Sequence, residues 1–91
     1  MLAKLTIQEE ALPVIKSSLD MKRKALEFNL HRYESRLADF ERRHQMTSEQ
    51  FSARFEAGEL GDDADWFEWE FVISAYQETM QQLQLLNSVR L

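Results

Sequence analysis

The stretch PVIKSSLDMKRKALEFNLHRYESRLADFERRH, residues 13–44, decides the fold of this chain. Apolar residues recur at every seventh position along it, a spacing typical of a helix that packs along one stripe against another helix. The pattern therefore predicts one long helix over residues 13–44, about 48 Å in length at 1.5 Å per residue. The members of the heptad series are Leu12, Leu19, Leu26, Tyr33 and Phe40, and Leu30 and Leu37 add a companion position in the second half.

The N-terminal half of this helix is predicted to have a narrower and more polar seam, because Lys16 and Arg23 occupy its companion positions. On the helix surface, Asp20 with Lys24 and Asp39 with Arg43 have the i,i+4 spacing of weakly favourable ion pairs.

The start of the long helix depends on Pro13. Thr6 and Glu9 have the spacing of a capping box, but a helix from Thr6 would place Pro13 in its interior, where proline removes a hydrogen bond and clashes with the preceding turn. We prefer a short turn of helix over residues 7–11, followed by a break, with Pro13 opening the long helix. One kinked helix from Thr6 is the alternative.

A second long helix is predicted over residues 64–87. Its two heptad series supply a stripe that can pair with the first helix. The first series is Trp66, Ile73, Met80 and Asn87, and the second is Trp69, Tyr76 and Leu83. Between the long helices, Thr47 and Gln50 have capping-box spacing and open a short helix over residues 48–57. The predicted fold is all-α: a long, coiled-coil-like antiparallel helical hairpin with a short helix in the connection, forming one domain over residues 1–91.

Several large apolar residues lie off the predicted seams. The start of the last helix should meet residues 30–40 near the connection, and we expect Phe67 and Phe71 to pack there beneath the short helix. Their expected contacts are Phe51, Phe55 and Leu60. The remaining surplus is exposed apolar surface of the kind that marks an interface. That surplus includes Val72, Phe28, Leu85 and Leu86.

Composition restricts the classes of protein. The 91 residues include no cysteine, so neither a disulfide framework nor a thiolate metal site is available. No apolar run reaches the about 20 residues of a membrane span, and residues 1–6 lack the apolar stretch of a secretory signal. We therefore expect a cytoplasmic protein that does not contact a membrane.

Charge is distributed unevenly within the net charge of −5. Residues 13–44 carry eight Lys/Arg against five Asp/Glu, whereas residues 45–91 carry two against nine, so the two long helices have opposite signs. The overall acidity argues against nucleic acid as a partner. We expect the basic side chains of the first helix to be solvated or paired within the chain, and a nucleic-acid-associated regulator that uses them is the weaker alternative. These side chains are Lys22, Arg23, Lys24, Arg32, Arg36, Arg42 and Arg43.

No catalytic or metal-binding motif is visible. Asp62, Asp63 and Asp65 lack the ligand ladder of a calcium loop, and capping and the helix dipole explain carboxylates at a helix start. His31 and His44 are thirteen residues apart without a further ligand at metal spacing, and His44 is placed to complement the dipole at a helix end. The sequence therefore predicts no cofactor, no metal and no enzyme activity, and a protein that works by binding a partner.

The connection carries a resemblance to a known family. Residues 46–71, MTSEQFSARFEAGELGDDADWFEWEF, resemble a segment of small prokaryotic helical proteins found as the antitoxins of type II toxin–antitoxin pairs, of the TumA kind beside a TumE toxin. The string GELGDDADWFEW is the most specific part. His44 and Gln45 stand where that pattern has Tyr-Gly. The resemblance implies a protein that binds and neutralises a small toxin encoded next to it.

This implication gives a specific hypothesis. The acidic half of the chain, from Glu59 to Glu70, would cover a basic surface of the toxin, because aromatic anchors dominate many interfaces and acidic residues speed the encounter with a basic partner. The predicted partner-binding residues are Asp62, Asp63, Asp65, Trp66, Phe67, Trp69, Phe71 and Val72. We also expect the chain to form a homodimer, and a dimer that also binds the toxin would fit this hypothesis. The alternative is a structural homodimer, two hairpins forming a four-helix bundle, or an adaptor without a toxin partner.

Overall fold

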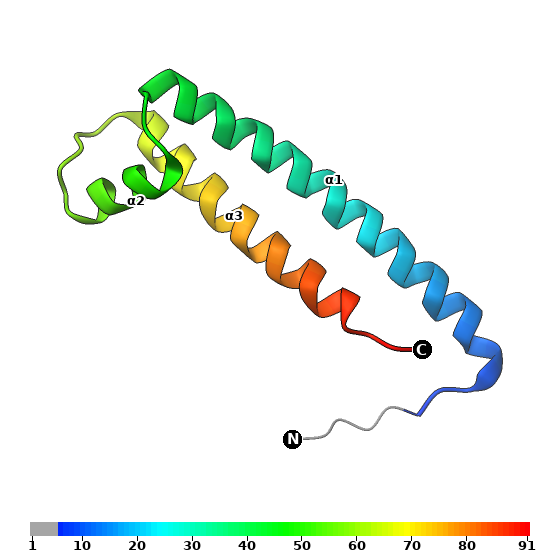
Figure 1. Ribbon diagram of the computed structural model, residues 1–91. Coiled ribbons are helices and arrows are strands. Elements are labelled where there is room, and N and C mark those ends of the chain that lie inside the picture. Colours follow the sequence, from blue (N-terminus) through cyan, green and yellow to red (C-terminus); the bar gives the residue numbers. More distant parts are fainter. Residues whose placement is uncertain (1–5) are drawn as a thin grey trace.

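The computed structural model describes residues 6–91 and contains three α-helices. They are α1 (Leu12–His44), α2 (Ser48–Glu56) and α3 (Ala64–Asn87). The long helices α1 and α3 run antiparallel and side by side, and the short α2 lies in the connection beside the start of α3 (Figure 1). The predicted all-α hairpin is therefore confirmed, with helix bounds within one residue of those expected. No helix in the described part of the chain combines the length and the apolar character needed to cross a membrane.

The start of α1 follows the two-piece prediction only in part. A 3₁₀ turn covers Glu9–Ala11, shorter than the predicted residues 7–11, and runs into α1 without the predicted break; α1 begins at Leu12 with Pro13 in its first turn. The first-turn amides of a helix have no partner within the helix, so a proline there loses no hydrogen bond. The signal-peptide expectation falls largely on residues 1–5, which lie outside the described residues.

The end of α1 has a left-handed backbone. Gln45 follows the last helical residue with φ 54° and ψ 42°, the conformation that glycine most often adopts after a helix. Its side-chain Nε2 donates a hydrogen bond to the carbonyl oxygen of Arg42 at 2.8 Å, so one of the last carbonyls of α1 is satisfied. The residue that replaces glycine in the resembled pattern thus keeps a backbone shape that suits glycine.

A Gln45→Gly substitution is therefore expected to stabilise the chain slightly. A left-handed conformation costs an L-residue roughly 1–2 kcal/mol, while glycine loses more backbone freedom on folding and the hydrogen bond to Arg42 disappears. We expect a net gain of up to about 1 kcal/mol in urea unfolding followed by circular dichroism. An Ala57→Gly chain is the control, because Ala57 has ordinary helical angles; an equal gain there would show that Gln45 is not strained.

The seam between α1 and α3 changes along its length. Leu26, Leu30 and Phe40 are buried, whereas Lys16 is exposed and Arg23 donates from Nε to Asn87 Oδ1 at 2.9 Å. The narrow and polar N-terminal half of the seam was predicted from Lys16 and Arg23, and it is confirmed.

The predictions of two ion pairs along α1 are wrong. Asp20 pairs with Arg23 at 2.6 Å and not with Lys24, and Asp39 pairs with Arg42 and not with Arg43. Residues three apart are also neighbours on a helix, and Arg43 instead crosses to α3.

An aromatic core fills the connection end of the hairpin. Phe51 of α2 stacks on Trp69 of α3, with ring centroids 4.1 Å apart and planes within 3°, and Phe40 of α1 stacks on the same indole at 5.5 Å. The Trp69 Nε1–H donates to Ser48 Oγ at 3.0 Å, so the buried indole leaves no polar group unpaired. The core cluster therefore joins all three helices.

The predicted capping box fixes the start of α2. The backbone N–H of Gln50 donates to Thr47 Oγ1 at 3.0 Å, and the backbone N–H of Thr47 donates to the side-chain Oε1 of Gln50 at 2.9 Å. These reciprocal bonds satisfy two amides that the helix itself cannot pair. They set the position from which Ser48 and Phe51 reach Trp69.

The stripe of α3 that packs against α1 differs from the predicted one. Val72 and Thr79 are buried, whereas Met80 is half-buried and Asn87 is exposed. Helix α3 is flanked by α1 on one side and by α2 on the other, so Trp69 faces both neighbours. The heptad pattern alone does not predict where α2 packs against α3.

Candidate binding surface at the connection end

Two of the predicted partner-binding residues belong to the core. Trp69 and Val72 are both 0% exposed, so neither side chain can touch a partner of the folded chain, and this corrects the prediction for them. Trp66 is half-buried between His44 and Phe51, with ring centroids 4.5 and 5.7 Å away. Trp66 therefore supports the surface and presents only part of its ring.

Phe67 and Phe71 lie on the outer side of α3. They are 63% and 66% exposed, so the expectation that they pack beneath α2 is wrong. Phe67 makes a T-shaped contact with Phe55, with ring centroids 6.0 Å apart. The aromatic residues of α3 that do pack against Phe51 are Trp66 and Trp69, about one turn apart on the side that faces α2. Two large apolar side chains are left in solvent one turn apart.

The three aspartates at the start of α3 have different surroundings. Asp63 is the N-cap, and its Oδ1 accepts a hydrogen bond from the Asp65 amide at 2.9 Å, as capping predicts. Asp62 is exposed. Among residues 6–91, no three His, Cys, Asp or Glu side chains come together as a metal site would require.

Asp65 connects the end of α1 to the start of α3. Its Oδ2 lies 2.8 Å from His44 Nε2 and 2.7 Å from Arg43 Nη1. The hydrogen bond to His44, followed by the one to Arg43, lowers the pKa of the Asp65 carboxyl from its ordinary value of 3.8. The His44 ring also stacks on Trp69 and contacts Trp66 at a tilt, so the ion pair sits against the aromatic core. The sequence predicted the position of His44 at a helix end but not this partner.

Asp65 is expected to make stability depend on acid pH. Because its folded pKa is depressed, its contribution is fully present above pH 3.8 and is lost as pH falls through the lower folded value. An Asp65→Asn chain should be less stable than the parent at neutral pH, and the difference should shrink well below pH 3.8 in urea unfolding. Asp62→Asn is the control and should keep the parental pH profile. Identical profiles for the parent and Asp65→Asn would contradict the assignment.

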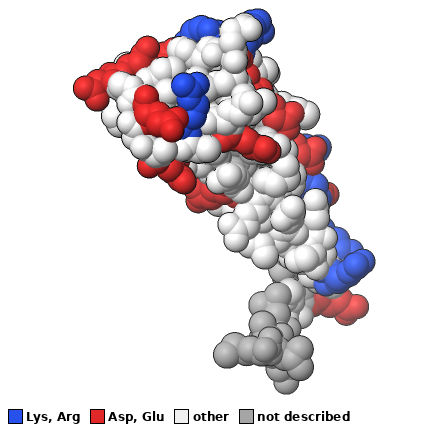
Figure 2. Space-filling view, turned by 60° about the vertical axis from the view of Figure 1, so that its left-hand side comes forward, with Lys and Arg blue, Asp and Glu red and all other residues white. Residues whose placement is uncertain are grey.

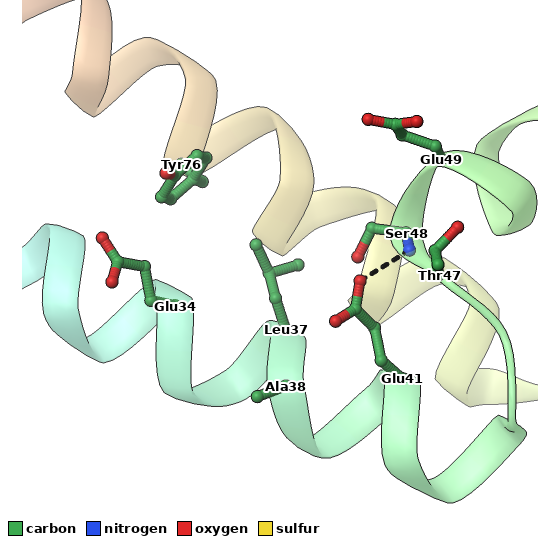
Figure 3. Close-up of a pocket in the computed structure, with 8 residues that line it drawn as sticks. All are labelled: Glu34, Leu37, Ala38, Glu41, Thr47, Ser48, Glu49 and Tyr76. Carbon is green, nitrogen blue, oxygen red and sulfur yellow. Dashed lines mark hydrogen bonds between the residues drawn. The ribbon is translucent and has the colours of Figure 1, made fainter.

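A groove with acidic walls lies between α1, the first turns of α2 and the middle of α3. Two adjoining hollows of about 450 and 400 Å³ share Leu37, Ser48, Glu49 and Tyr76. Figure 3 shows Leu37 at the centre of the first hollow, with Glu34 and Glu41 from α1 and Glu49 from α2 around it. The Ser48 amide donates to Glu41 Oε2 at 2.7 Å, which places that carboxylate at the N-terminus of α2. No lysine or arginine lines either hollow.

Sequence reasoning missed this groove. Glu34 and Glu41 are seven residues apart on α1, which could have signalled one acidic stripe. Glu49 joins them only because α2 docks beside α1. The groove is therefore a second acidic feature, apart from the predicted surface, with three carboxylates around a half-buried apolar floor.

Acidic side chains dominate the outside of the connection end. Residues 33–76 contain eleven Asp/Glu and four Lys/Arg, a net charge of −7. Figure 2 shows many acidic side chains and a few basic ones over the upper end of the molecule, with an uncharged surface below them. Four of the arginines predicted to be solvated or paired do form ion pairs: Arg23, Arg36, Arg42 and Arg43. The negative electrostatic potential of the connection end would attract a basic surface of another protein.

Comparison with known proteins gave no match to any family model, curated protein or solved structure. The class of protein therefore rests on the fold and on the surface described above.

Proposed function

We propose that this chain is an antitoxin-like binding protein that neutralises a small, basic, co-encoded toxin by protein–protein contact. The observation that carries the proposal is the pair Phe67 and Phe71, exposed one turn apart on the most acidic part of the molecule. Aromatic anchors set among charges of one sign suit a partner of the opposite sign. Residues 46–71, which carry the family resemblance, form α2, the connection and the first turns of α3, so the resemblance and the surface fall on the same end.

Two physical roles divide the surface in this proposal. Phe67 and Phe71 supply apolar contact area that water leaves on binding. Asp62 and the other carboxylates at the start of α3 attract a basic partner and speed the encounter with it. Trp66, Trp69, Asp63 and Asp65 hold this surface in place without providing most of the contact.

Growth of the host provides the test. The small protein encoded by the adjacent gene is expressed either by itself or together with this chain. We expect the host to stop growing when the small protein is expressed by itself and to grow again when this chain is present. The two proteins should also co-purify. A neighbouring protein that neither arrests growth nor binds the purified chain contradicts it. In that case the remaining reading is a self-associating bundle or an adaptor without a toxin partner.

Matched variants locate the contact. A Phe67→Ala/Phe71→Ala chain should bind the toxin at least about thirtyfold more weakly, since a hot-spot aromatic contributes about 2 kcal/mol or more. Phe28→Ala is the control, because Phe28 is 64% exposed but lies on α1. Asp62→Lys should weaken binding mainly at low salt, because exposed charges are screened at high salt. An unchanged dissociation constant in the double variant would remove this surface from the mechanism.

A further inference from the structure

The two ends of the hairpin bury their apolar residues to different degrees. We define the open half as residues 12–32 and 77–91. The core cluster of Phe40, Phe51, Trp69 and Val72 lies wholly at the connection end, and the open half has only Leu26 and Leu30 as buried apolar residues. Of the eight large hydrophobic side chains exposed in the described part of the chain, six lie in the open half. They are Val14, Met21, Phe28, Leu85, Val89 and Leu91.

The chain also has more surface than a monomer of its size. Its accessible surface is 7294 Å² for 10.8 kDa, against about 5,500 Å² expected of a folded monomer. Counting residues 1–5 at the about 800 Å² of a fully extended chain still leaves an excess of about 1,000 Å². A standard interface takes about 800 Å² from each partner. The excess is thus large enough to be the surface that a stable dimer would cover.

An apolar hollow lies in the open half between α1 and α3. Its volume is about 510 Å³, and Lys22 is its only charged lining residue. Its apolar walls are Leu26, Leu85, Leu86 and Val89. These side chains come from both long helices, so the hollow is a place where another helix can pack against the pair.

Charge selects the direction in which a second copy would pack. The open half carries six Lys/Arg and three Asp/Glu, a net charge of +3, whereas residues 33–76 carry −7. The open halves overlap in either direction, but a parallel pair would also set the two acidic connection ends side by side, whereas an antiparallel pair keeps them at opposite ends. Like charges facing each other at an interface are unfavourable, so the charges favour the antiparallel pair.

We propose that a second copy of this chain covers the open half, in an antiparallel dimer with two-fold symmetry. The hollow lined by Leu26, Leu85 and Val89 is the centre of the interface on each copy, and the four long helices form a bundle where the open halves overlap. The two connection ends lie at opposite ends of the assembly, so Phe67 and Phe71 stay exposed. The dimer does not depend on the proposed toxin partner.

Sedimentation equilibrium of single variants tests the interface. The parent chain should sediment at twice its mass of 10.8 kDa, and Leu85→Glu should sediment as a monomer with unchanged helical circular dichroism. Phe71→Glu is the matched control, since it lies fourteen residues earlier on α3 with similar exposure, 66% against 63%, and should stay dimeric. Val89→Glu should repeat the effect of Leu85→Glu. A monomeric parent, a dimeric Leu85→Glu chain or a monomeric Phe71→Glu chain would each overturn the proposal.

The direction of packing has a separate test, made simple by the absence of cysteine. A spin label on Glu59→Cys, in the connection, reports the distance between the two connection ends by pulsed electron resonance. An antiparallel dimer should give about 50 Å or more, the length of α1 at 1.5 Å per residue. A distance well below the length of that helix would show that the connection ends lie together, and would overturn the antiparallel arrangement.

Discussion

A Trp69→Ala chain is expected to lose about 3–5 kcal/mol of its free energy of unfolding. The indole is fully buried, stacks on Phe51 and Phe40, and donates a hydrogen bond to Ser48. Its removal leaves a cavity where the three helices meet, and Ser48 loses its donor. Because native domains are stable by only about 5–15 kcal/mol, this loss removes a large share of the free energy of unfolding and should lower the urea midpoint strongly.

Urea unfolding followed by circular dichroism measures this loss. Trp69→Phe is the control, because it keeps an aromatic ring in the stack while removing the indole N–H, and it should cost clearly less than alanine. An alanine variant that unfolds at the same urea concentration as the parent would show that the aromatic core does not hold the hairpin together.

Val72→Glu and Phe71→Glu form the second prediction, on adjacent residues with opposite surroundings. Val72 has no exposed surface, so a carboxylate there is buried without a partner and should cost several kcal/mol. Phe71 is mostly in solvent, and its replacement should change stability by no more than about 0.5 kcal/mol. The helical signal at room temperature and the urea midpoint distinguish the two variants directly.

The pair also tests the rotation of α3 about its axis. The sequence pattern placed both residues off the seam, whereas the structure turns one into the core and the other outward. Equal effects of the two substitutions would mean that α3 is rotated relative to the arrangement described here. A larger loss at Phe71 than at Val72 would mean the same.

The helices could be read from the sequence because local chemistry decides where they begin and end. Pro13, the reciprocal pair Thr47 and Gln50, and Asp63 each act within one turn of the backbone, so their positions follow from short spacings. The pairing of α1 with α3 followed from seven-residue periodicity. Both the capping residues and the seven-residue periodicity can be recognised within a single helix, without knowledge of how the helices pack.

The errors arose where a third element decides which side chain is buried. A heptad pattern assumes one neighbour for each helix, but α3 has two at its start, and Phe67 and Phe71 turn outward because Trp66 and Trp69 face α2. The same docking brings Glu49 beside Glu34 and Glu41. The acidic groove could not be predicted, since no spacing along the sequence gives the direction in which a nine-residue helix packs.

The concentration of the core at the connection sets an order for folding. Contacts at that end close short segments, 21 residues between Ser48 and Trp69 and 22 between Arg43 and Asp65, whereas Arg23 and Asn87 are 64 residues apart. A threefold longer segment costs about 1 kcal/mol more chain entropy to close, so the hairpin should close first at the connection and then zip toward the termini. In the Leu85→Glu chain, amide hydrogen exchange should therefore be slowest near Trp69 and quicken steadily along both long helices toward their free ends.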